Sequence, residues 1–251
     1  MEPTKITSAL NPHIKRVVKL HTAQERKQAK RFIAEGIRAI RTALSAFTLD
    51  TLFCTEKTLA SAKEMARYTQ IILIADSLMD KISATSTPSG LLAILKTPQQ
   101  PAPEKLERGI VLAQVHDPGN MGTLIRTAAA CNIKSVVLIE GSDPWSPKVI
   151  QSAAGTHAHV DIFQWDWNQL LAHKKNLLLY ALVVKDGKSP SFIDPKKALL
   201  VIGSEAHGLP SDWINNCDEQ ITLPMPGSAE SLNAAIAGSI VMYNVFIDAK
   251  D

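Results

Sequence analysis

The chain has 251 residues, of which 45% are hydrophobic and 20% charged, and a net charge of +3 at pH 7. This composition is typical of an ordinary folded protein with one large or two small domains. The apolar runs are shorter than the roughly 20 residues that cross a bilayer, and the N-terminal residues lack an apolar leader, so we expect a cytoplasmic protein. Three widely spaced cysteines without a CxxC pair predict reduced thiols.

Positive charge is concentrated in the first 50 residues. They hold ten Lys and Arg against four acidic residues, so they carry +6 and leave −3 for the remainder. A basic segment beside a near-neutral domain suits a polyanion, and nucleic acid is the commonest one. On charge alone, a solvated helix face explains the same pattern equally well.

The N-terminal part alternates helical and strand-like patterns. After a basic amphipathic stretch, residues 32–47 (FIAEGIRAIRTALSAF) predict a helix, and apolar runs at 51–55, 71–76 and 91–96 predict strands. Prolines in the stretch 96–109 remove backbone donors and indicate a linker. We therefore predict a small α/β domain at residues 1–97, a linker at 98–107 and a larger domain at 108–251.

The C-terminal part repeats apolar runs of strand length. These runs lie at residues 109–115, 135–140, 159–163, 177–184, 198–204 and 219–225. Helical patterns between several of them, such as 123–132 and 146–158, predict parallel strands with crossover helices. The last segment, 228–249, is apolar on most of its circumference and predicts a helix buried against the sheet or against a second subunit.

Three glycine-bearing corners follow strands, where open α/β sheets bind their ligands. In the first, residues 116–122 (HDPGNMG) predict a turn into a helix, because glycine allows positive φ and Asn120 offers both a donor and an acceptor. Arg126 lies one turn into that helix. A guanidinium there favours binding of a phosphate or carboxylate over a structural salt bridge.

The second and third corners leave two interpretations open. In residues 199–210 (LLVIGSEAHGLP), Glu205 follows a buried strand and either binds a polar ligand or caps the next turn. In the third corner, Pro224 and its neighbour Pro226 stop a strand and leave backbone groups free for another partner. Ser231 and Asn233 then begin the last helix, where they either cap it or face a ligand.

Together the three corners resemble the SpoU, or TrmH-like, family of RNA ribose 2′-O-methyltransferases in the SPOUT class. Motif 1 of that family is similar to residues 117–133, motif 2 to 201–209 and motif 3 to 221–243, and the resemblance spans 109–251. It implies a mostly parallel sheet with flanking helices and a deep trefoil knot. The N-terminal part resembles the family's L30e-like α/β RNA-binding domain.

The resemblance implies methylation of a ribose 2′-oxygen of structured RNA from S-adenosyl-L-methionine, with ribosomal RNA expected ahead of tRNA. It assigns the catalytic wall to Arg126, Asn120, Glu205, Ser231 and Asn233. It assigns cofactor contacts to Gly203, Gly208, Ile221, Leu223, Met225 and Leu232. It also implies a homodimer through the catalytic domain, and no metal.

The basic N-terminal segment is then expected to bind RNA phosphates. The residues concerned are Lys15, Arg16, Lys19, Arg26, Lys27, Lys30 and Arg31. A guanidinium stays protonated in proteins and is a poor proton acceptor, so we expect Arg126 to fix the 3′-phosphate and lower the pKa of the 2′-hydroxyl. Two alternatives stay open: a tRNA methyltransferase, and a non-catalytic RNA-binding protein with a vestigial second domain.

A metal site is disfavoured. His157, His159 and Asp161 alternate along a predicted strand, and such a pattern without further ligand spacing more often means a half-exposed strand.

Overall fold

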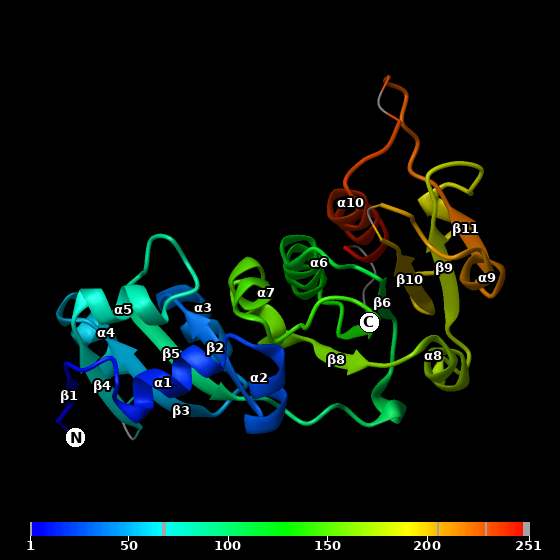
Figure 1. Ribbon diagram of the computed structural model, residues 1–251. Helices are drawn as coiled ribbons and strands as arrows, with labels where there is room; N and C mark the ends of the chain where they lie inside the picture. Colours follow the sequence, from blue (N-terminus) through cyan, green and yellow to red (C-terminus); the bar gives the residue numbers. More distant parts are fainter. Residues whose placement is uncertain (1, 67–68, 205, 229, 248–251) are drawn as a thin grey trace. The chain divides into compact units, whose positions relative to one another are not determined.

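The computed structural model describes residues 2–66, 69–204, 206–228 and 230–247. The chain folds into two compact units, each with its own sheet (Figure 1). The first unit comprises Met1–Gln99 and Asp143–Ala158, and the second comprises Gln100–Ser142 and His159–Asp251. The chain therefore passes from one unit to the other three times.

The first unit is built on a mixed five-stranded sheet of order β1-β4-β3-β5-β2. The strands are β1 (Thr4–Ile6), β2 (Arg31–Glu35), β3 (Leu49–Cys54), β4 (Gln70–Ile74) and β5 (Leu91–Lys96). β5 runs antiparallel to its neighbours β2 and β3, whereas β3, β4 and β1 are parallel. Both faces of this sheet are covered, so its strands are apolar along most of their length.

Helices cover both faces of this sheet, and one face also takes a helix from much later in the sequence. Apolar side chains of α1 (Pro12–Lys19) and α5 (Asp76–Ile82) form one core. The other core takes side chains from α3 (Ile37–Ala43), from α4 (Leu59–Met65) and from α7 (Pro147–Ser152), which lies far along the chain. The short helix α2 (Ala23–Ala29) leads into β2.

The second unit contains a six-stranded, fully parallel sheet of order β11-β9-β10-β6-β7-β8. Its strands are β6 (Gly109–Ala113), β7 (Ser135–Ile139), β8 (Asp161–Gln164), β9 (Leu178–Leu182), β10 (Ala198–Ile202) and β11 (Glu219–Ile221). β6, β7 and β10 are buried at every position, as expected for strands covered on both faces. The predicted parallel α/β architecture is confirmed.

The helices of the second unit form two groups. α8 (Trp167–His173) and α9 (Ser211–Asn215) contribute to one core, where the rings of Trp167 and Trp213 stack at 4.7 Å. α6 (Pro118–Ala130) and α10 (Ala234–Phe246) pack together, and α10 also contacts β10 (Figure 1). Gly238 allows this close approach, because a Cβ there would lie 2.6 Å from a side-chain carbon of Ile202 and 2.8 Å from one of Leu124.

Three local predictions need correction. Residues 32–47 do not form one helix: β2 ends at Glu35, Gly36 turns the chain at φ +91°, and only then does α3 begin. The run 159–163 becomes a strand only from Asp161, because residues 156–159 form a 3-10 helix. The run 219–225 gives the three residues of β11 alone, since Pro224 cannot continue a ladder.

Candidate active site

The turn between β6 and α6 is organised by Asp117. Its carboxylate accepts a hydrogen bond from the backbone N–H of Asn120 at 2.8 Å and so caps α6, while Pro118 occupies the first helical turn, where a missing N–H costs nothing. The sequence assigned no role to Asp117. Its place before a proline and three residues before Asn120 was the available signal for a helix N-cap.

Motifs 1 and 3 meet at two asparagines. The side-chain amide of Asn233 donates to Oδ1 of Asn120 at 3.2 Å, across 113 positions of sequence. Asn233 also caps α10, because its Oδ1 accepts from the backbone N–H groups of Ala235 and Ile236 at 2.9 and 3.2 Å. Because its Oδ1 is used in the cap, Asn233 contacts Asn120 through its Nδ2 group, and this contact joins the starts of α6 and α10.

A second contact fixes α6 against α10 farther along. The hydroxyls of Thr127 and Ser239 lie 3.0 Å apart. Asn120 and Thr127 are two turns apart on α6, which places both side chains on the flank that faces α10. The start of motif 1 is therefore positioned by packing as well as by its turn.

Arg126 lies elsewhere on α6. Its side chain is exposed, and six residues separate it from Asn120, so the two point about 120° apart around the helix. Arg126 forms no ion pair within the part of the chain that the structure describes. The chain by itself thus brings together Asn120 and Asn233, but not Arg126 with them.

The motif 2 corner is a tight turn after β10. Ser204 and Gly208 exchange two backbone hydrogen bonds, at 3.1 and 2.9 Å, and Gly208 has φ +67°. A Cβ at Gly203 would lie 2.6 Å from the backbone carbon of Gly208, so only glycine fits there. Glu205 lies outside the described residues.

The motif 3 loop begins at Ile221, which is fully buried. The Ile221 carbonyl accepts from the N–H of Val183 at 2.9 Å, and the next N–H, of Thr222, donates to the carbonyl of Lys188 at 2.9 Å. Leu223 and Met225 are half-buried, whereas Ser231 and Leu232 are exposed.

Beyond Thr222 this loop is sparsely bonded. Among the described residues, no backbone hydrogen bond joins residues 223–232 to the rest of the chain. In Figure 1 the same segment extends as a long loop between β11 and α10. That the backbone groups around the two prolines bind a ligand stays a prediction.

Arg26, expected to contact RNA, is instead part of the buried interior. Its side chain is 5% exposed, with Nε and Nη2 donating to Oδ2 of Asp143 at 2.9 and 2.6 Å. Its Nη1 donates to the backbone carbonyls of Leu20 and His21 at 2.9 and 2.8 Å. A guanidinium with this many partners is not available to a phosphate, so this assignment is wrong.

Two further arginines of the basic segment share one acid. Arg16 and Arg31 both donate to the carboxylate of Asp50, Arg31 at 2.6 Å and Arg16 at 3.0 Å. Burial opposes ionisation of Asp50, but the hydrogen bonds from these arginines outweigh it and lower its pKa to about 2. The lysines of the segment are exposed, and these are Lys15, Lys19, Lys27 and Lys30.

His157 belongs to the interior and not to a metal centre. It is 1% exposed, its Nε2 lies 2.9 Å from the Pro144 carbonyl oxygen, and burial lowers its pKa to about 4, so it is neutral. Among the described residues, no three His, Cys, Asp or Glu side chains are grouped to hold a metal. Burial also raises the pKa of the thiols of Cys54 and Cys217, to about 11 and about 12.

An exposed apolar stripe on α10 was not located by the sequence. Ile236, Ile240, Tyr243 and Ile247 are 39% to 59% exposed and follow a four-three-four spacing, opposite the buried face of the helix. The spacing of these residues indicates the stripe, but the residues on the buried face of α10 are also apolar, so the sequence does not show which face is exposed. No helix among the described residues is long and apolar enough to span a membrane.

Comparisons with known proteins find matches to both parts of the chain. Residues 107–243 match the SpoU rRNA Methylase family, and residues 11–93 match an MRM3-like substrate binding domain. RlmP of Bacillus subtilis (strain 168), a 23S rRNA (guanosine(2553)-2′-O)-methyltransferase, is 27% identical over 248 residues, which cover 96% of this chain and 98% of RlmP.

Two further similarities extend over the whole chain. An uncharacterised tRNA/rRNA methyltransferase of Synechocystis sp. is 31% identical over 253 residues, covering 95% of this chain and 92% of that protein. The crystal structure of an AdoMet-bound rRNA methyltransferase from Sinorhizobium meliloti shares the fold, with a TM-score of 0.87, 23% identity and 99% of both chains covered. The chain therefore belongs to the SpoU rRNA methylase family.

Proposed function

We propose that the protein transfers the methyl group of S-adenosyl-L-methionine to a ribose 2′-oxygen of ribosomal RNA. The observation that carries this proposal is the Asn120–Asn233 contact, which brings motifs 1 and 3 together in a chain of this family. RlmP, similar over nearly its full length, is named for this reaction on 23S rRNA.

The residues around motifs 2 and 3 fit the cofactor. Only glycine is tolerated at position 203, and the backbone groups of residues 223–228, which make no backbone–backbone hydrogen bond among the described residues, offer donors and acceptors to an adenine edge. We propose cofactor contacts at Gly203, Gly208, Ile221, Leu223, Met225 and Leu232. When bound, S-adenosyl-L-methionine supplies an electrophilic methyl group on a positively charged sulfur.

The chain's own residues must activate a poor nucleophile. A ribose hydroxyl has to lose its proton as it attacks, so a cation beside the adjacent phosphate favours the developing alkoxide. We assign that role to Arg126, and orientation of the ribose to Asn120, held by Asn233. Glu205 and Ser231 complete the polar wall in this proposal.

A homodimer completes the proposal. Arg126 is exposed on α6, and its neighbour α10 carries the apolar stripe Ile236, Ile240, Tyr243 and Ile247. A second copy packed on this stripe would bury it and bring other groups toward Arg126. A deep trefoil knot in residues 108–251, an RNA-binding role for residues 1–97 and a cytoplasmic location, all expected from the sequence, stay part of this proposal.

The dimer is tested by Ile240→Glu, which places a charge in the stripe. We expect the variant to sediment as a monomer in analytical ultracentrifugation and to lose methylation, because a buried unpaired charge is costly. Lys196→Glu, an exposed position of the second unit, is the matched control and should remain dimeric. A wild-type protein that sediments as a monomer would contradict the dimer.

The activity is tested with purified protein, radiolabelled S-adenosyl-L-methionine and undermodified ribosomal RNA, followed by ribose-methylation mapping. We expect the mapping to show 2′-O-methylation at one nucleotide of the ribosomal RNA. Methylation of tRNA alone would select the tRNA alternative, which the name of the Synechocystis relative also allows. If calorimetry detects no binding of S-adenosyl-L-methionine although the protein binds RNA, the non-catalytic alternative is selected.

A further inference from the structure

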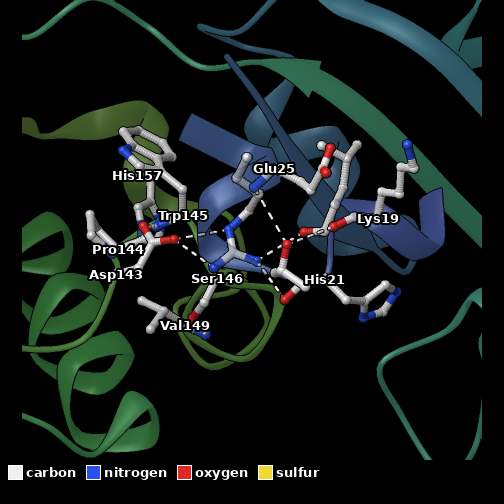
Figure 2. A network of polar contacts seen from close by, with 12 residues as sticks. Lys19, His21, Glu25, Asp143, Pro144, Trp145, Ser146, Val149 and His157 are labelled. Atoms are coloured by element: carbon white, nitrogen blue, oxygen red, sulfur yellow. Dashed lines mark hydrogen bonds and ion pairs between the residues drawn. The ribbon is translucent and has the colours of Figure 1, made fainter. Parts of the chain in front are cut away.

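A polar network in the first unit includes Asp143, the residue that directly follows Ser142 of the second unit in sequence. Figure 2 shows its residues, with Asp143, Trp145 and His157 labelled. Arg26 holds one carboxylate oxygen of Asp143, and the other oxygen accepts from the N–H of Trp145 at 2.9 Å. Asp143 therefore has both oxygens occupied and a fixed orientation.

The segment that begins at Asp143 is anchored deeply in the first unit. The ring of Trp145 lies 5.1 Å from that of Phe32 and 5.4 Å from that of His157, and Ile150 is part of the core under the sheet. Gly155 approaches α3 so closely that a Cβ would lie 2.3 Å from the carbonyl oxygen of Ala39. Asp143 is thus the first residue of a rigid insertion, and not of a free loop.

The residue before it is bonded to motif 1. The N–H of Ser142 donates to the carbonyl of Val115 at 3.1 Å, and its hydroxyl donates to the carbonyl of His116. His116 precedes Asp117, whose carboxylate caps α6 at Asn120. Since one peptide bond joins Ser142 to Asp143, a short series of bonds leads from Arg26 to the start of α6.

We propose that Arg26 is a positioning residue for the motif 1 turn. By fixing Asp143 it restrains Ser142, which in turn restrains His116 and the capped start of α6 that carries Asn120. The claim that this restraint serves catalysis rests on the proposed function. The restraint itself does not, because it can be measured without any reaction.

The measurement is amide hydrogen exchange over residues 115–120 and 142 in the full-length protein. Asp143→Asn keeps an acceptor for the Trp145 N–H and removes the charge that Arg26 binds. Arg26→Lys keeps a cation but cannot bind the carboxylate and two carbonyls together. We expect exchange there to accelerate about three- to thirty-fold in both variants, the range of typical coupling energies.

Glu35→Gln is the matched control. The Glu35 carboxylate accepts from the hydroxyls of Ser83 and Thr85 and organises another loop of the first unit, and among the described residues it makes no hydrogen bond to motif 1. We expect this variant to accelerate exchange near residues 83–89 and to leave residues 115–120 unchanged. Equal acceleration of the motif 1 turn in the control would overturn the proposal, as would no acceleration in Asp143→Asn.

Kinetics then test the catalytic consequence. With saturating RNA, kcat of Asp143→Asn should fall by a factor similar to the exchange effect, while KM for RNA and the affinity for S-adenosyl-L-methionine stay within about twofold. A selective exchange effect with unchanged kcat would refute the positioning role. If the wild type does not methylate RNA, the proposed function fails, yet the exchange experiment still decides whether the restraint exists.

Discussion

Two polar clusters of this molecule differ in how far their groups are buried. Around Arg26, the guanidinium, the Asp143 carboxylate and two carbonyls satisfy one another in a buried setting. Around Asn120 the groups are half-buried or exposed, and Arg126 points into solvent. Buried polar groups that pair with one another support the fold, whereas exposed polar groups such as the Arg126 guanidinium are the ones that the proposed function assigns to the substrate.

The largest effect that sharpens this comparison is expected at Arg126. Arg126→Ala should lower kcat about 10²- to 10³-fold, as loss of one charge-stabilising donor does. Its removal should leave the melting temperature and calorimetric affinity for S-adenosyl-L-methionine nearly unchanged, because the side chain is exposed. Arg38→Ala, another exposed arginine on a helix, is the control. Loss of cofactor affinity in Arg126→Ala would contradict the assignment.

Arg26→Ala should have the opposite profile. It leaves a partly buried carboxylate and two carbonyls without their partner, which costs about 3 kcal/mol of unfolding free energy. Urea unfolding followed by tryptophan fluorescence, sensitive to Trp145, measures it. Arg41→Ala removes an exposed ion pair with Glu64 and should cost less than about 1 kcal/mol. Similar losses in the two variants would break the distinction between the clusters.

Asp50 gives a smaller effect that depends on pH. Its pKa is about 2 in the folded protein against 3.8 unperturbed, so the carboxylate stabilises the fold at neutral pH. That stabilisation, about 1–2 kcal/mol after allowance for partial exposure, is lost as pH falls from about 5 toward 2. Comparing acid unfolding of wild type and Asp50→Asn measures it. The difference in stability should shrink with falling pH, and a constant difference would contradict the lowered pKa.

The smallest effect concerns the exposed lysines. Lys15→Gln and Lys19→Gln should each reduce the slope of log binding constant for RNA against log salt by about 0.7–0.9. Fluorescence anisotropy with a ribosomal RNA fragment at several salt concentrations gives the slope. Lys196→Gln and Lys197→Gln, exposed in the second unit, are matched controls. An unchanged slope in the first pair would exclude those lysines from the RNA interface.

The sequence predicted most strands because their apolar runs are continuous, and the three corners because glycine, proline and asparagine restrict backbone geometry there. It did not predict β2, since the run FIAEG also fits a helix when Gly36 is taken as tolerated. Nor could it separate Arg26 from the exposed lysines. The deciding partner, Asp143, lies 117 positions away, and local charge pattern contains no information on such distant pairing.

The position of α7 in the sequence affects the order in which the first unit can be completed during synthesis. All five strands of that sheet are complete at Lys96, but Trp145 and α7 are translated only after the linker, β6, α6 and β7. At ordinary translation rates, Trp145, which packs against the rings of Phe32 and Phe47, is added on the order of seconds after Lys96. A chain that ends before Trp145 would therefore lack the aromatic ring that packs on Phe32 and Phe47.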